Sequence, residues 1–149
     1  MSVSFESWLK EGRLKRHKPA RQEIAGLAAL ADRRLADSRV AGLSAEGRFL
    51  LAYNAAVAVA TAALHAAGYR TSTNLPGHHA VTIASLGLTL GAEPSVVSAL
   101  DAWRKKRNLA TYAVPAPVSE HELRELVTLA EKLKADLLAW LRARHPTLL

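Results

Sequence analysis

The longest weakly polar segment of the chain, residues 49–67, is rich in alanine and constrains the fold more than any other segment. Its apolar run is interrupted by Tyr53, Asn54, Thr61 and His65, whereas a membrane-spanning helix needs about 20 predominantly apolar residues. We therefore expect a buried helix here and no membrane span. Because alanine side chains are small, the backbones of neighbouring helices can approach this helix closely.

Capping residues and helix breakers predict where the helices begin and end. Ser44 precedes the alanine-rich segment and Gly68 follows it, which predicts a helix over residues 45–67. Ser119, with Glu122 three positions later, has the pattern of a capping box at the start of the last helix. The full set of expected helices is 5–11, 19–38, 45–67, 78–90, 93–112 and 119–144.

The order of these elements predicts the fold class. No segment shows the alternating pattern of a strand, although β-branched residues make the helix over 78–90 the weakest of the set. Short loops between long amphipathic helices favour antiparallel neighbours. We expect one all-α domain over residues 1–149, an up-and-down bundle of five to six helices. Residues 1–18 form a short helix and a basic linker, and residues 19–144 form the core bundle.

The chain is basic, with 20 Lys and Arg against 13 Asp and Glu and a formal net charge of +7. The excess lies in residues 1–39 and 101–149, while residues 40–100 are neutral and are expected to form the interior or a self-association surface. Such a balance favours anionic partners such as nucleic acid or acidic protein. The absence of cysteine excludes a disulfide framework and a thiolate metal site. With no signal-peptide pattern at the N-terminus, we expect a cytoplasmic protein.

The end of the fifth helix combines positive charge, an amide and a phenol. Val96, Leu100 and Trp103 follow one helical face, and the next step of four residues reaches Arg107. A guanidinium group suits phosphate or carboxylate. The polar residues that share a sector of roughly 140° of this helix are Arg104, Arg107, Asn108, Thr111 and Tyr112. They can bind a phosphodiester, or they can simply cap carbonyl groups and bond across a subunit interface.

The helical plan resembles the HEPN superfamily over residues 19–143. The motifs that carry the resemblance are Gly68-Tyr69-Arg70, Gly77-His78-His79 and the late Arg107-Asn108-x-x-x-Tyr112. The resemblance implies a homodimeric helical bundle, as in metal-independent endoribonucleases whose motif is Arg followed by four to six residues and His. Tyr112 stands where that His would be. Tyrosine has an ordinary pKa of about 10 and is a poor base near neutrality.

The resemblance implies RNA as the partner. Arg107 and Asn108 would engage phosphate and Tyr112 would support them as a proton donor, in a cleft formed by two copies of the chain. Further RNA contacts are expected from Arg70, His78, His79, Arg104, Lys105 and Thr111. The chain would then bind RNA, or cut it without a metal, as in toxin-antitoxin or phage-defence systems. The alternative is a catalytically silent module that binds a partner protein, an antitoxin or a nucleotidyltransferase; a small-ligand or nucleotide-binding bundle ranks below both.

No cofactor or metal site is expected from the sequence, which lacks the known phosphate-loop and zinc motifs. His65 is expected to be a hydrogen-bonded interior histidine and His17 to be solvated. The basic run over residues 10–18 can track a nucleic-acid backbone, but a solvated linker is the favoured interpretation.

Overall fold

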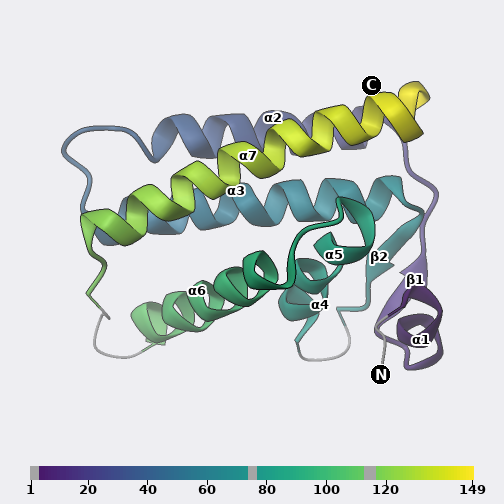
Figure 1. Ribbon diagram of the computed structural model, residues 1–149, viewed down its shortest axis with the longest axis horizontal. Helices are drawn as coiled ribbons and strands as arrows, with labels where there is room; N and C mark the ends of the chain where they lie inside the picture. Colours follow the sequence, from purple (N-terminus) through teal and green to yellow (C-terminus); the bar gives the residue numbers. More distant parts are fainter. Residues whose placement is uncertain (1–3, 74–76, 113–116) are drawn as a thin grey trace.

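The structure, a computed structural model, describes residues 4–73, 77–112 and 117–149, without the side chains of residues 107–112. Its centre is helix α3 (Ala45–Ala66), which packs against both α2 (Arg21–Asp37) and α7 (Glu120–Arg144). Figure 1 shows these three helices along the long axis of the molecule. The expected all-α bundle is thus confirmed in its main features.

The alanine-rich composition of α3 explains its central place. Alanines on several sides of the helix are almost fully buried, among them Ala52, Ala55, Ala60 and Ala63. Larger side chains, such as Phe49, fill the remaining space of the core. Ser44 caps the helix by accepting a hydrogen bond from the Gly47 backbone at 3.0 Å. The predicted cap and the predicted burial are both confirmed.

Consecutive long helices alternate in direction. In Figure 1, α2 and α6 (Pro94–Tyr112) run towards the left, whereas α3 and α7 run towards the right. Helix α7 begins with the predicted capping box, in which Ser119 and Glu122 each bond the other's backbone. The chain ends in a short 3₁₀ helix, η1 (Pro146–Leu148). The start of α2 differs slightly from expectation, since the helix begins at Arg21 and not at Pro19.

The single helix expected over residues 78–90 is wrong. The structure has two short helices instead, α4 (His78–Ala84) and α5 (Leu86–Thr89). The break falls at Ser85, whose hydroxyl donates to the Thr82 carbonyl at 2.6 Å. Hydroxyl groups that bond nearby backbone carbonyls compete with the regular helix, and they explain a bend that hydrophobic periodicity does not predict.

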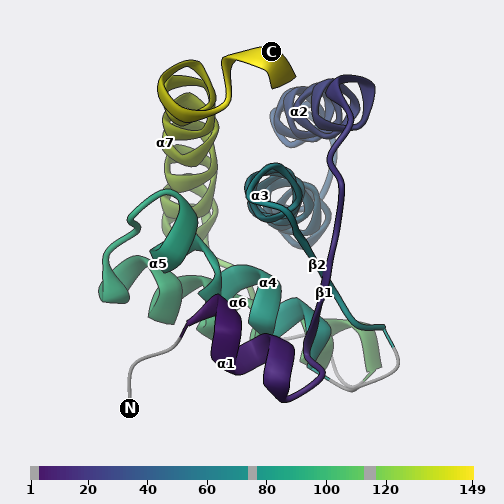
Figure 2. The ribbon, with the colours of Figure 1, turned by 90° about the vertical axis from the view of Figure 1, so that its right-hand side faces the viewer.

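The N-terminal arm contains the second departure from the sequence prediction. Helix α1 (Phe5–Lys10) forms as expected, with Ser4 and Ser7 in a capping box. Strand β1 (Leu14–Arg16) then pairs antiparallel with β2 (Tyr69–Thr71), although no strand was expected. This sheet lies beside the end of α3 (Figure 2). Trp8, Leu14, Leu64 and Val81 form a second small core beneath it.

Helix α3 is also the one helix in the described residues that is long and apolar enough to cross a membrane. However, 67% of its most apolar window is buried inside the fold. That burial is typical of the core helix of a soluble protein, and it agrees with the expectation of no membrane span.

Candidate functional site

The described cations near the end of α6 are paired with acidic groups of the same chain. Arg104 Nε donates to Asp101 Oδ1 at 2.9 Å, and Lys105 Nζ lies 3.5 Å from Asp101 Oδ2. The hydrogen bond from Arg104 lowers the pKa of the Asp101 carboxyl below its ordinary value. Arg104 and Lys105, both predicted to contact RNA, therefore have part of their charge neutralised within the helix.

Lys106 forms an ion pair with a residue of a different helix. Its Nζ donates to Glu122 Oε2 at 2.7 Å, which joins α6 to the start of α7. This hydrogen bond is the main reason why the pKa of Glu122 is lowered. Hydrogen bonds from the backbone and the side chain of Ser119 lower this pKa further. Lys106 therefore also has an acidic partner within the chain.

The side chains at the centre of the predicted motif, those of residues 107–112, are not among the described side chains. The backbone of Arg107, Asn108, Thr111 and Tyr112 continues α6 without a break. The four residues therefore share one helix, as predicted. The directions and partners of their side chains stay predictions.

The β1–β2 ribbon brings together basic residues that are distant in the sequence. Lys15 lies directly opposite Arg70 in the antiparallel register. Backbone hydrogen bonds extend the pairing, from the His17 N–H to the Gly68 carbonyl at 2.8 Å and from the Ser72 N–H to the Arg13 carbonyl at 2.9 Å. The interpretation of residues 10–18 as a solvated linker is therefore wrong, because part of this run is a paired strand.

Five exposed cations lie in β1, in β2 or between the end of β1 and the first residue of α2. They are Lys15, Arg16, Lys18, Arg21 and Arg70, and we call them the basic ribbon. Within the described part of the chain, none of the five forms an ion pair, whereas neighbouring Arg13 is paired with Glu11 at 2.9 Å. Arg70, predicted to contact RNA, thus lies among other unneutralised charges.

His78 and His79 begin α4, directly after Gly77 in a left-handed conformation (φ 84°). Their rings lie edge to face with centroids 4.4 Å apart, and α4 itself lies beside β2. Both side chains are half-buried. The two histidines therefore begin a helix, as expected from the sequence, and this helix lies beside the sheet.

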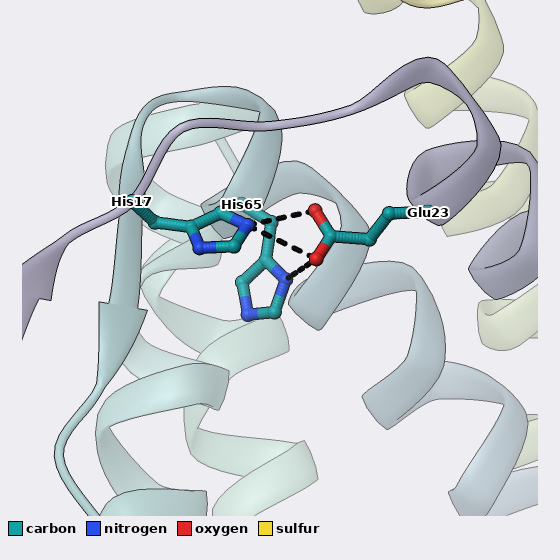
Figure 3. Close-up of side chains that lie close together, drawn as sticks. All are labelled: His17, Glu23 and His65. Atoms are coloured by element: carbon teal, nitrogen blue, oxygen red, sulfur yellow. Dashed lines mark hydrogen bonds and ion pairs between the residues drawn. The ribbon is translucent and has the colours of Figure 1, made fainter.

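Three side chains without any motif-like spacing in the sequence converge beside the end of β1 (Figure 3). They are His17 from the arm after β1, Glu23 from α2 and His65 from α3. His17 Nε2 lies 2.8 Å and 3.0 Å from the two carboxylate oxygens of Glu23. His65 Nδ1 lies 3.6 Å from Glu23 Oε2. The expectation that His17 is solvated is wrong, because only 19% of its side chain is exposed.

The environment of His65 favours the uncharged ring. Burial is the main cause that lowers its pKa, and repulsion from His17 and Arg70 adds to this effect, while Glu23 opposes it. Its Nδ1 atom is buried and has no hydrogen-bond partner among the described residues. His65 is therefore not the fully hydrogen-bonded interior histidine that was expected.

A pocket of about 550 Å³ lies between α6 and α7. Its walls are partly apolar, from Val96, Trp103 and Leu129, and partly charged, with both basic and acidic side chains: Arg124, Glu125 and Lys132. The pocket is open at the surface of the bundle.

Comparisons of the chain with protein-family models, with curated proteins and with solved structures found no match. No relative therefore assigns a role to these residues. Their functions are inferred from geometry, charge and the motif of α6.

Proposed function

We propose that this chain is a HEPN-like RNA-binding protein whose main RNA contact is the basic ribbon. The observation that carries the proposal is the pairing of Lys15 with Arg70, two exposed cations placed opposite each other without an acidic partner. Like charges opposite each other in a sheet are destabilising. A phosphate backbone offers each of them a partner and releases bound counterions on binding.

The charges of the basic ribbon differ from those at the end of α6. Arg104, Lys105 and Lys106 already have carboxylate partners within about 3.5 Å. RNA would have to compete with these partners, whereas the ribbon cations are unengaged. We therefore propose the basic ribbon, and not the end of α6, as the principal contact with RNA. Arg70 keeps the role expected from the sequence.

The test is a comparison of two double substitutions with the same change in net charge. Lys15→Gln with Arg70→Gln removes the unpaired cations, and Arg34→Gln with Lys132→Gln removes two cations that are paired with Asp37 and Asp136. Binding to a fluorescent single-stranded RNA is measured by anisotropy. The first variant should bind at least about tenfold more weakly, since a phosphate contact contributes on the order of 1 kcal/mol. The control should bind like the wild type; equal losses in both variants would show that only net charge matters.

RNA cleavage without a metal is the further activity that we propose for the α6 motif. Its support is the unbroken helix through Tyr112, which places Arg107, Asn108 and Tyr112 on one helix. In a homodimer, Arg107 would stabilise charge on the phosphate and Tyr112 would donate a proton. Cleavage of RNA in EDTA should require Arg107, so Arg107→Ala should abolish it. Equal cleavage by wild type and variant, or none by either, would remove the enzyme hypothesis.

The alternative is a silent module that binds a partner protein, an antitoxin or a nucleotidyltransferase. The pocket between α6 and α7 supports it, because Trp103 and the apolar side chains beside it offer a surface that a partner protein can bury. Under this alternative the wild type would bind no RNA at physiological salt. The anisotropy measurement therefore separates the alternative from RNA binding.

A further inference from the structure

His17, Glu23 and His65 come from three different elements, and their ligand atoms all lie within 4.8 Å of one another. We propose that these three side chains bind a divalent transition-metal ion such as Zn²⁺, which fastens the N-terminal arm to α2 and α3. This site was not expected from the sequence, and it does not depend on the proposed RNA binding.

The donor set fits such an ion. Imidazole nitrogens and a carboxylate oxygen are common ligands of Zn²⁺, and two histidines with one carboxylate form a recurrent three-ligand site. His17 presents Nε2 and His65 presents Nδ1 to the same carboxylate of Glu23 (Figure 3). The oxygen-only sites preferred by Mg²⁺ and Ca²⁺ have a different composition.

The spacing of the ligand atoms requires little movement. Zn²⁺ bonds to nitrogen and oxygen are about 2.0–2.2 Å long, so ligand atoms around a tetrahedral ion lie roughly 3.3 Å apart. The observed separations are 2.8 Å and 3.0 Å between His17 and Glu23, and 3.6 Å between Glu23 and His65. Side-chain shifts on the order of 1 Å suffice to place one ion between all three residues.

The buried nitrogen of His65 is a second argument. His65 Nδ1 is buried, and its 3.6 Å contact with Glu23 Oε2 is too long for a hydrogen bond, so this polar atom lacks one at a cost in folding free energy. A metal ion bound at Nδ1 gives this atom a partner and relieves that cost. The three side chains remain partly accessible, with 19%, 32% and 19% exposed for His17, Glu23 and His65. An ion can therefore enter from solvent, and three ligands leave at least one position for water.

A metal ion in this cluster would hold the N-terminal arm against the helices. His17 directly follows β1 and lies between Arg16 and Lys18 of the basic ribbon. An ion that holds His17 against α2 and α3 fixes the arm whose remaining anchors are the β1–β2 pairing and the small core around Trp8.

The experiment uses the full chain after dialysis against EDTA. Zn²⁺ is titrated by calorimetry, and Co²⁺ provides a visible absorption spectrum that reports its ligands. The wild type should bind one ion per chain and should melt at a higher temperature with Zn²⁺ than with EDTA. Even groups that do not touch the metal and only hydrogen-bond its ligands typically change metal affinity about 10- to 100-fold. His17→Gln, Glu23→Gln and His65→Gln should therefore each weaken binding by more than about 10-fold.

The matched control is His121→Gln on α7. His121 forms an exposed pair with Glu125 but has no third ligand near it in the described part of the chain. This variant should bind Zn²⁺ like the wild type. Glu23→Gln keeps the size of the side chain, and its circular dichroism in EDTA shows whether it remains folded. The proposal is overturned if the wild type binds no Zn²⁺, if the three variants bind as tightly as the wild type, or if His121→Gln loses as much affinity as they do.

Discussion

Lys15 and Arg70 lie directly opposite each other in the β1–β2 ribbon, and both side chains are exposed without an acidic partner in the described residues. This arrangement costs folding free energy, because like charges face each other across two strands. It also concentrates positive side-chain charge on two strands that are held together by backbone hydrogen bonds. A polyanion is the partner that best satisfies both observations.

Arg70→Glu should stabilise the fold while it weakens RNA binding. The new carboxylate would face Lys15 and replace a repulsion with an attraction, a gain of about 0.2–1 kcal/mol in the free energy of unfolding. Urea denaturation at low salt measures this gain. Adding Lys15→Glu should cancel it, because two carboxylates would then face each other; a double variant as stable as Arg70→Glu would show that the pair does not interact.

The ion pair between Asp101 and Arg104 should make stability depend on pH. The folded pKa of Asp101 is lowered, mainly by the hydrogen bond from Arg104. Its contribution is therefore fully present above the ordinary aspartate pKa and is lost as the pH falls through the lower folded value. Asp101→Asn should be less stable than the wild type near pH 7, and the difference should shrink at acidic pH. A difference that stays constant across this range would mean that the loss does not come from the ionised carboxylate.

The close approach of helices at α3 predicts sensitivity to larger side chains. Ala60 is fully buried in the core, so Ala60→Leu should destabilise the protein by about 1–3 kcal/mol through overpacking. Asn54 lies on the same helix and is exposed, which makes Asn54→Leu the matched control for residue size. Thermal and urea denaturation should show a large loss for the first variant and little change for the second. Similar losses would contradict the packing described for α3.

Most helix boundaries could be predicted from the sequence because their signals are local. The caps Ser44 and Ser119 lie next to the helices that they begin, and the alanine-rich segment identifies the central helix by its composition. The break at Ser85 was missed because a serine hydroxyl can also face solvent without disturbing a helix. Local signals therefore predict elements well but not every bend within them.

The β1–β2 pairing and the cluster of His17, Glu23 and His65 depend on contacts between distant parts of the chain. Local sequence signals could therefore not predict them. Strands of three residues are too short to show alternation, and β1 pairs with a segment more than about 50 residues away in the chain. His17, Glu23 and His65 likewise have no motif-like spacing. Arg70 was predicted as an RNA contact from its place in a loop, and that role stays a prediction, whereas its position opposite Lys15 follows only from the strand register.

The proposed RNA contact joins the unpaired cations of the basic ribbon to phosphate groups of RNA. Its most direct test is the salt dependence of RNA affinity, measured by anisotropy for the wild type, for Lys15→Gln with Arg70→Gln, and for the paired-cation control Arg34→Gln with Lys132→Gln. Each phosphate contact to a single strand contributes about 0.7 to the slope of log affinity against log salt concentration, so two lost contacts should reduce the slope by about 1.4. The control should keep the wild-type slope. A wild type that binds no RNA, or a ribbon variant with an unchanged slope, would contradict the claim.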